Sequence, residues 1–178
     1  MEEKPEKRRA LFLDRDGTIN VEKNYVSCIE DFEFRDGIFD LAKAYFDSGY
    51  YIFVVTNQSG IARGFYTEED FNRLTRWMTE RFKEKGIRIA RVYHCPHHPE
   101  ITGGCSCRKP QPGMLQEAIH EFGLNPAECV MIGDQEGDVG AGRNAGIGRI
   151  IRIHESGRID IAHGTVYIGG NTADQRLL

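Results

Sequence analysis

The chain has 178 residues, of which 40% are hydrophobic, and this is enough to build the core of one compact domain. Its formal net charge is -4 and its pI is about 5.9, which gives no general attraction to nucleic acid or to anionic lipid. No apolar stretch approaches the ~20 residues of a membrane span, and the charged N-terminus lacks the apolar segment of a signal peptide. We therefore expect a single-domain, monomeric, cytoplasmic protein with no nucleic-acid or membrane partner, preceded by a solvated basic tail at residues 1–9.

Strands and helices are expected to alternate along the first half of the chain. Residues 10–13 form a short apolar run that ends in a polar turn, which predicts a buried strand. Apolar residues then recur at helical spacing over residues 37–48, and residues 50–55 form a second apolar run followed by another polar turn. Thr67 and Asp70 resemble a capping box, which predicts a long amphipathic helix that ends near Gly86.

The second half continues this alternation. Strands are expected at residues 91–94 and 129–132, with a helix at 113–122 between them, and beyond about residue 157 we expect an edge strand around 166–168 and a tail. The pattern predicts an α/β fold with a doubly wound, Rossmann-like parallel sheet and no separate cap domain. Ligands bind beyond the carboxyl ends of such strands, so the turns around Asp14, Thr56 and Asp134 should line one crevice.

The side chains of these turns suit phosphoryl transfer to water. That reaction needs a carboxylate nucleophile, a second acid, a divalent cation and positive charge for the phosphoryl oxygens. Asp14 and Asp16 are the candidate carboxylates, Thr56 supplies a hydroxyl group, and Lys109 supplies an ammonium group. Magnesium prefers oxygen ligands, so Asp14, a backbone carbonyl near Asp16, and Asp134 would hold it. Participation of the neighbouring Gln135 or Asp138 is left open.

Four motifs resemble, in order, those of the haloacid dehalogenase (HAD) superfamily of phosphatases. They lie at residues 14–18, 54–60, 107–110 and 133–134. The resemblance implies that Asp14 accepts the phosphoryl group and that Asp16 acts first as general acid and then as general base. It also implies that Thr56 and Lys109 hold the phosphoryl group.

Within the superfamily, residues 61–64, 95–99 and 105–110 are similar to the family that acts on D-glycero-D-manno-heptose 1,7-bisphosphate. This resemblance implies removal of the C7 phosphate during synthesis of nucleotide-activated heptose for lipopolysaccharide or a related glycan. Histidinol-phosphate phosphatase is the alternative activity, and a nucleic-acid-binding zinc loop is a further alternative that the acidic balance disfavours. The expected substrate-contacting residues are Arg15, Glu22, Lys23, Asn24, Tyr25, Asn57, Gln58, Ser59, Arg63 and Arg108.

Two positions differ from many relatives. The chain has Glu22-Lys23-Asn24-Tyr25 where relatives often have Asp-His-Gly-Tyr, and Gln135 where many have lysine. Both positions are expected to face the substrate, so they bear on the sugar and its anomer.

A cysteine-rich loop at residues 95–107 is expected to bind zinc. Its three cysteines suit thiolate ligation in a reducing compartment better than a disulfide framework, and with one histidine they form a tetrahedral set. His94 and His98 compete for the fourth place, but the family pattern implies His97. The expected ligands are Cys95, His97, Cys105 and Cys107. Such a structural zinc would order the loop and direct Arg108 and Lys109 into the crevice.

Overall fold

The computed structural model describes residues 8–154 and three later strands at 159–162, 165–168 and 175–176. The elements are, in order, β1 (Ala10–Leu13), α1 (Ile38–Asp47), β2 (Tyr51–Asn57), α2 (Glu68–Glu84), β3 (Ile89–Cys95), α3 (Pro99–Thr102), α4 (Gly113–Phe122), a 3-10 turn (Pro126–Glu128), β4 (Val130–Gly133), α5 (Glu136–Asn144), β5 (Arg149–Arg152), β6 (Ile159–Ala162), β7 (Thr165–Ile168) and β8 (Gln175–Arg176).

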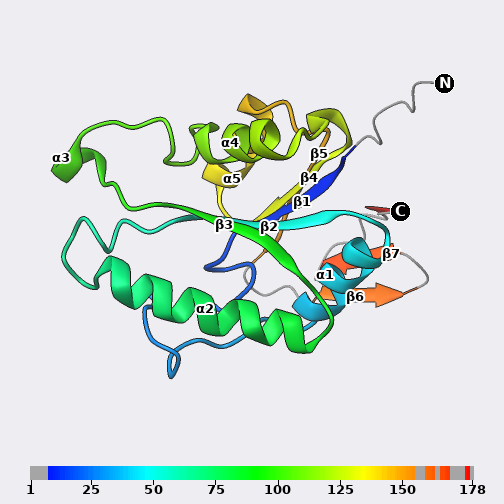
Figure 1. The fold of residues 1–178 in the computed structure, drawn as a ribbon, viewed down its shortest axis with the longest axis horizontal. Helices are drawn as coiled ribbons and strands as arrows, with labels where there is room; N and C mark the ends of the chain where they lie inside the picture. The colour runs from blue at the N-terminus through cyan, green and yellow to red at the C-terminus, as the bar shows by residue number, and fades with distance from the viewer. Residues whose placement is uncertain (1–7, 155–158, 163–164, 169–174, 177–178) are drawn as a thin grey trace.

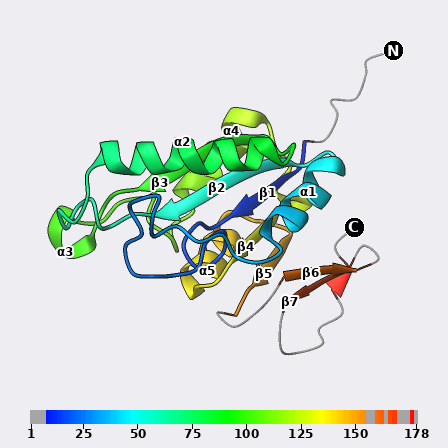
Figure 2. The same ribbon diagram turned by 90° about the horizontal axis from the view of Figure 1, so that it is seen from below.

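The main sheet has five parallel strands in the order β3-β2-β1-β4-β5. Helices α1 and α2 cover one face of it, and α4 and α5 cover the other (Figures 1 and 2). The chain runs outward from β1 through β2 to β3, and then returns to β4 on the other side of β1. This reversal places the switch point of the sheet between β1 and β4, where doubly wound folds bind ligands. The predicted doubly wound sheet is confirmed.

Strand β1 shows why the central strands read as continuous apolar runs. Its four residues are fully buried because successive side chains point to opposite faces of the sheet and both faces are covered. Leu11 and Leu13 pack in the core that α1 and α2 share, whereas Ala10 and Phe12 pack in the core on the α4 side. On that second face Phe12 stacks on Phe53 of β2, with ring centroids 5.3 Å apart.

Helix α2 begins at the predicted capping box. The Thr67 hydroxyl accepts a hydrogen bond from the Asp70 backbone N–H at 3.1 Å, and the Asp70 carboxylate accepts one from the Thr67 N–H at 2.9 Å. Both N–H groups belong to the first turn, which has no intrahelical partners for them. The buried side chains of the helix are those expected from the spacing, Phe71, Leu74, Met78 and Phe82.

Both ends of the chain make contacts that the sequence did not predict. The expected C-terminal edge strand belongs instead to a separate antiparallel sheet in the order β6-β7-β8, and β6 lies beside α1. The edges of the main sheet are β3 and β5. The last two residues of the expected N-terminal tail contact the domain. The Arg8 backbone carbonyl accepts a hydrogen bond from the Asn125 N–H at 2.9 Å, and the Arg9 guanidinium group donates one to the Ser48 carbonyl at 2.8 Å. The rest of that tail lies outside the described residues.

Helix α5 and strand β5 were not predicted. The helix contains three glycines and little apolar surface, so its sequence lacks the periodicity that marked the other helices. Two of these glycines permit close packing: a methyl group at Gly140 would lie 2.7 Å from Pro110, and one at Gly142 would lie 3.0 Å from Ile150. No helix of the described residues has both the length and the hydrophobicity to cross a bilayer.

Candidate active site and metal clusters

The carboxyl ends of β1, β2 and β4 meet at one edge of the sheet. Asp14 follows β1, Thr56 is the penultimate residue of β2, and Asp134 follows β4. Beside them is a pocket of about 260 Å³, open on one side and covered by no inserted domain, since residues 14–37 and 58–67 form loops. It is lined by Asp14, Asp16, Glu22, Asn24, Tyr25, Thr56, Asn57, Gln58, Ser59, Tyr66, Lys109, Gln135, Gly137 and Asp138.

Lys109 is the buried cation of the pocket floor. Its Nζ donates to Asp14 Oδ1 at 2.7 Å, to Asp138 Oδ1 at 2.6 Å and to the Val55 carbonyl at 2.7 Å. Burial alone would lower the pKa of Lys109, but the two carboxylates outweigh burial and raise it, so the side chain carries its charge. Asn57 holds the Lys109 backbone from β2, accepting from its N–H at 3.0 Å and donating to its carbonyl at 3.1 Å.

Three carboxylates surround this lysine. Oxygens of Asp14, Asp134 and Asp138 lie within 4.8 Å of one another, and all three residues are buried. Burial raises the pKa of Asp14, against the opposing effect of Lys109, and burial also raises the pKa of Asp134. Three carboxylates against one ammonium group leave excess negative charge in a buried place, which is costly without a further cation.

Asp134 has a carboxylate oxygen that is free to bind such a cation. Its Oδ2 accepts from Gln135 Nε2 at 2.6 Å, whereas its buried Oδ1 has no hydrogen-bond partner among the described residues. The loop after β1 comes very close to it: a methyl group at Gly17 would lie 2.3 Å from Asp134 Oδ2, so only glycine fits there. The oxygen donors of this cluster fit a hard divalent cation such as Mg²⁺.

The part that Asp138 plays was left open by the sequence. Its Oδ2 accepts from the Gln135 backbone N–H at 3.0 Å at the start of α5, and its Oδ1 pairs with Lys109. One carboxylate therefore caps a helix and neutralises the pocket lysine. The sequence could have indicated the contact with the Gln135 N–H, because Asp138 stands three residues after a possible N-cap. It offers no comparable signal for the pairing with Lys109.

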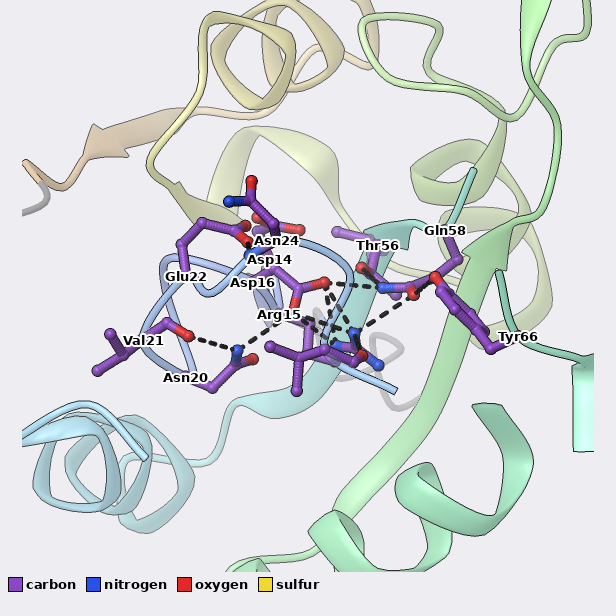
Figure 3. Close-up of polar contacts among 12 residues, drawn as sticks. Asp14, Arg15, Asp16, Asn20, Val21, Glu22, Asn24, Thr56, Gln58 and Tyr66 are labelled. Atoms are coloured by element: carbon purple, nitrogen blue, oxygen red, sulfur yellow. Dashed lines mark hydrogen bonds and ion pairs between the residues drawn. The ribbon is translucent and has the colours of Figure 1, made fainter. Parts of the chain in front are cut away.

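Asp16 lies at the centre of a hydrogen-bond network at the side of the pocket (Figure 3). Arg15 donates to both of its carboxylate oxygens at distances from 2.9 to 3.2 Å. Asn20 donates to Oδ1 at 3.1 Å and Gln58 donates to Oδ2 at 2.9 Å. Both carboxylate oxygens of Asp16 are therefore engaged in this network, and Asp16 is not a member of the cluster that Asp14, Asp134 and Asp138 form.

The loop from Glu22 to Tyr25 forms the rim of the pocket. Asn24 and Tyr25 have φ values of 56° and 57°, which places both in the left-handed region that non-glycine residues seldom adopt. Glu22 stabilises this turn by accepting from the Asn24 N–H at 2.6 Å. Burial, followed by the charge of Asp16, raises the pKa of Glu22. Tyr25 is 44% exposed and meets the Phe65 ring edge-on, with centroids 4.8 Å apart.

Four basic residues expected to contact the substrate do not line the pocket. Arg15 is 1% exposed and also donates to the Val26 carbonyl at 2.7 Å, so it supports Asp16 from beneath the pocket surface. Lys23 pairs with Glu33 at 2.9 Å. Arg63 and Arg108 both face the zinc loop, since Arg63 lies 2.7 Å from His98 Nε2 and Arg108 donates to the His97 carbonyl at 3.3 Å.

The four expected zinc ligands form one cluster at the end of β3. The Cys107 sulfur lies 3.0 Å from that of Cys95, 3.5 Å from that of Cys105 and 3.3 Å from His97 Nδ1, and all four ligand atoms lie within 4.8 Å of one another. Burial raises the pKa of the Cys105 thiol, but the Arg108 backbone N–H and the neighbouring thiols outweigh it and lower the pKa to about 7. Three sulfur donors and one imidazole at this spacing fit zinc.

The two competing histidines have other partners. His94 Nε2 lies 2.9 Å from Glu68 Oε2, and the ring stacks on Phe71. His98 caps the short helix α3, where its Nδ1 accepts from the Glu100 N–H at 3.3 Å. This geometry agrees with the choice of His97.

Comparisons with known proteins agree with this geometry. A family profile described as HAD-hydrolase-like matches residues 106–151. The D-glycero-alpha-D-manno-heptose-1,7-bisphosphate 7-phosphatase of Campylobacter jejuni is 50% identical over 149 residues, covering 84% of this chain and 84% of that protein. The D-glycero-beta-D-manno-heptose-1,7-bisphosphate 7-phosphatase of Haemophilus ducreyi is 44% identical over 145 residues, covering 79% of this chain and 80% of that protein. The crystal structure of D,D-heptose 1,7-bisphosphate phosphatase from B. bronchiseptica, complexed with magnesium and phosphate, superposes with a TM-score of 0.73 at 27% identity, covering 80% of this chain and 78% of that chain.

Proposed function

Because this chain belongs to the heptose-1,7-bisphosphate 7-phosphatase family of HAD-like phosphatases, we propose that it hydrolyses the C7 phosphate of D-glycero-D-manno-heptose 1,7-bisphosphate. The reaction serves the synthesis of nucleotide-activated heptose, for lipopolysaccharide or a related glycan. The observation that carries the proposal is the contact of Asp14 Oδ1 with Lys109 Nζ at 2.7 Å, inside a pocket that Asp16 and Thr56 also line.

In the first step an oxygen of Asp14 attacks the phosphorus of the C7 phosphate. The new Asp14 O–P bond forms as the bond between phosphorus and the sugar oxygen breaks, and Asp16 gives its proton to that oxygen. Thr56 and Lys109 donate hydrogen bonds to the phosphoryl oxygens as charge shifts among them. Donors placed where charge develops typically contribute about 2.7 to 4 kcal/mol each.

In the second step a water molecule attacks the phosphorus of the aspartyl-phosphate. Asp16, now a carboxylate, takes a proton from this water, the Asp14 O–P bond breaks, and inorganic phosphate leaves with Asp14 restored as a carboxylate. The fixed position of Asp16 beside the pocket suits both proton transfers. The remaining product is the heptose 1-phosphate with a free hydroxyl group at C7.

Asp14, Asp134 and the backbone carbonyl near Asp16 would hold the magnesium ion, with Asp138 as the third carboxylate of the cluster. When bound, magnesium neutralises charge on the phosphoryl group. The unpartnered Asp134 Oδ1 supports this assignment.

The zinc ion would have a structural part. Cys95, His97, Cys105 and Cys107 would fill all four of its positions, and Lys109 follows the last ligand by two residues. The cluster needs free thiols, which supports the reducing cytoplasm as the compartment.

The test is steady-state phosphate release from the alpha and beta anomers of the heptose bisphosphate and from histidinol phosphate, with and without Mg²⁺. We expect the higher kcat/KM for a heptose bisphosphate, dependence on Mg²⁺, and no turnover by Asp14→Asn as the matched control. A higher kcat/KM for histidinol phosphate would contradict the proposed substrate. A nucleic-acid-binding role would require salt-sensitive binding of DNA or RNA together with no phosphatase activity.

A further inference from the structure

Gln58 is a buried amide whose hydrogen-bonding capacity is completely used. The side chain follows β2 and its residue is 2% exposed. Its Nε2 donates to Asp16 Oδ2 at 2.9 Å and to Thr56 Oγ1 at 2.8 Å (Figure 3). Its Oε1 accepts a short hydrogen bond from the Tyr66 hydroxyl and another at 3.3 Å from Arg15. A carboxamide has two N–H donors and two acceptor lone pairs, and all four are occupied.

These four partners determine which way the amide points. An arginine can only donate, so Oε1 must face Arg15, and Nε2 must then face the Asp16 carboxylate. Tyr66 reinforces this orientation because burial raises its pKa to about 12, so its hydroxyl keeps the proton that it donates. The Tyr66 ring is itself held against the loop backbone, since a methyl group at Gly60 would lie 2.2 Å from it.

The amide thus connects two groups with different tasks in the proposed reaction. Thr56 binds the phosphoryl group that is transferred, and Asp16 protonates the oxygen that leaves. One N–H of Gln58 reaches each of them, so their separation depends on a single planar group. A misplacement of about 1 Å can cost 100-fold in rate, so such a link matters for catalysis.

We propose that Gln58, oriented by Tyr66, is a positioning residue that holds the acid Asp16 at a fixed distance from Thr56, which binds the phosphoryl group. The inference rests on the proposed function, and it gives Gln58 a different task from the substrate contact expected from the sequence. Glutamate at this position would place an oxygen against Asp16 Oδ2, and an apolar residue would leave Asp16 and Arg15 each short of one partner.

The test compares leaving groups, using Gln58→Met and Tyr66→Phe on a series of aryl phosphates from 4-nitrophenyl to phenyl phosphate. 4-Nitrophenolate leaves without protonation, whereas phenolate needs the acid, and kcat/KM reports only the steps up to transfer onto Asp14. For Gln58→Met we expect kcat/KM on phenyl phosphate to fall on the order of 10- to 100-fold further than on 4-nitrophenyl phosphate. Tyr66→Phe should show the same trend at about 3- to 10-fold.

The matched control is Tyr45→Phe, which removes the hydroxyl of another buried tyrosine, on α1 and outside the pocket lining. Any change that Tyr45→Phe causes in kcat/KM should be the same for every aryl phosphate in the series. An equal loss across the series, or no loss, in Gln58→Met and Tyr66→Phe would overturn the positioning role. If Gln58→Met does not fold, Tyr66→Phe decides alone by the same criterion.

The aryl series contains no sugar, so it separates this inference from the substrate assignment. Wild-type turnover of the aryl phosphates without turnover of heptose bisphosphate would reject the proposed substrate and leave the leaving-group result to decide on Gln58. Absence of any wild-type turnover in the presence of Mg²⁺ would overturn both proposals.

Discussion

Replacing Lys109 with methionine should destabilise the fold as well as stop catalysis. The ammonium group donates to Asp14 and Asp138 at 2.7 and 2.6 Å and to the Val55 carbonyl at 2.7 Å, and the Lys109 side chain is 4% exposed. Methionine keeps an unbranched stem of similar length but provides no donor. The variant therefore leaves two buried carboxylates without their cation.

The size of this effect follows from the burial of the pair. Removing one partner of a buried ion pair costs about 3–5 kcal/mol, because the remaining charge stays uncompensated. For a domain of this size each kcal/mol lowers Tm by roughly 2–4 °C, so Tm should fall by about 6–20 °C. Burial already raises the pKa of Asp14, and loss of Lys109 removes the main opposing effect.

This cause makes the deficit depend on pH. A carboxyl group whose pKa is raised in the folded state stabilises the fold when protonated, and that contribution is lost as pH rises through the folded pKa. In Lys109→Met the folded pKa of Asp14 should lie still higher. The Tm deficit should therefore be largest at neutral pH and above, and should shrink as pH falls toward the ordinary carboxyl range near 4.

Calorimetry in EDTA from about pH 8 to pH 5 measures this deficit, with Lys43→Met as the control. Lys43 forms an exposed ion pair with Asp47 on α1, and its loss should cost only about 0–1 kcal/mol at any of these pH values. A Tm of Lys109→Met equal to that of Lys43→Met at neutral pH, or a deficit that stays constant with pH, would refute the reasoning.

Three further variants test other parts of the structure. Asp14→Asn should have no turnover and should keep its zinc, and residual turnover would argue against covalent catalysis at this residue. In EDTA its Tm at neutral pH should be at least equal to that of the wild type, because the variant lacks a carboxylate whose charge is disfavoured by burial. Cys107→Ala should lose zinc by elemental analysis and show lower activity and a lower Tm, and full retention of zinc and rate would refute the structural role. Thr67→Ala should cost about 1 kcal/mol in urea unfolding because α2 loses its cap, with kcat unchanged; a changed kcat would contradict a purely structural cap.

The parts of the fold that the sequence predicted carry local signals. Strand β1 and helix α4 were predicted with the bounds that the structure has, since a continuous apolar run or a helical spacing needs no tertiary information. The convergence of Asp14, Thr56 and Asp134 followed from the rule that parallel strands end at the same edge of a sheet. Helix α5 was missed because close packing against Pro110 and Ile150, rather than an apolar stripe, determines its sequence.

The parts that were missed depend on which partner a long side chain reaches. Arg15 and Arg108 were expected to contact the substrate, Arg108 because the family resemblance implied it, and in the structure Arg15 donates to Asp16 and Arg108 to the His97 carbonyl. Likewise, the pairing of Lys109 with Asp138 joins residues from different elements, and no local pattern predicts it. Residue type indicated the chemistry of the pocket, whereas tertiary packing assigned each residue its partner.

A rapid-quench experiment with heptose bisphosphate labelled at the C7 phosphorus tests the central claim most directly. During turnover the wild-type protein should carry acid-trapped label that mapping assigns to Asp14, and Asp14→Asn should carry none. Turnover by the wild type with no trapped label, or label on a residue other than Asp14, would contradict the mechanism.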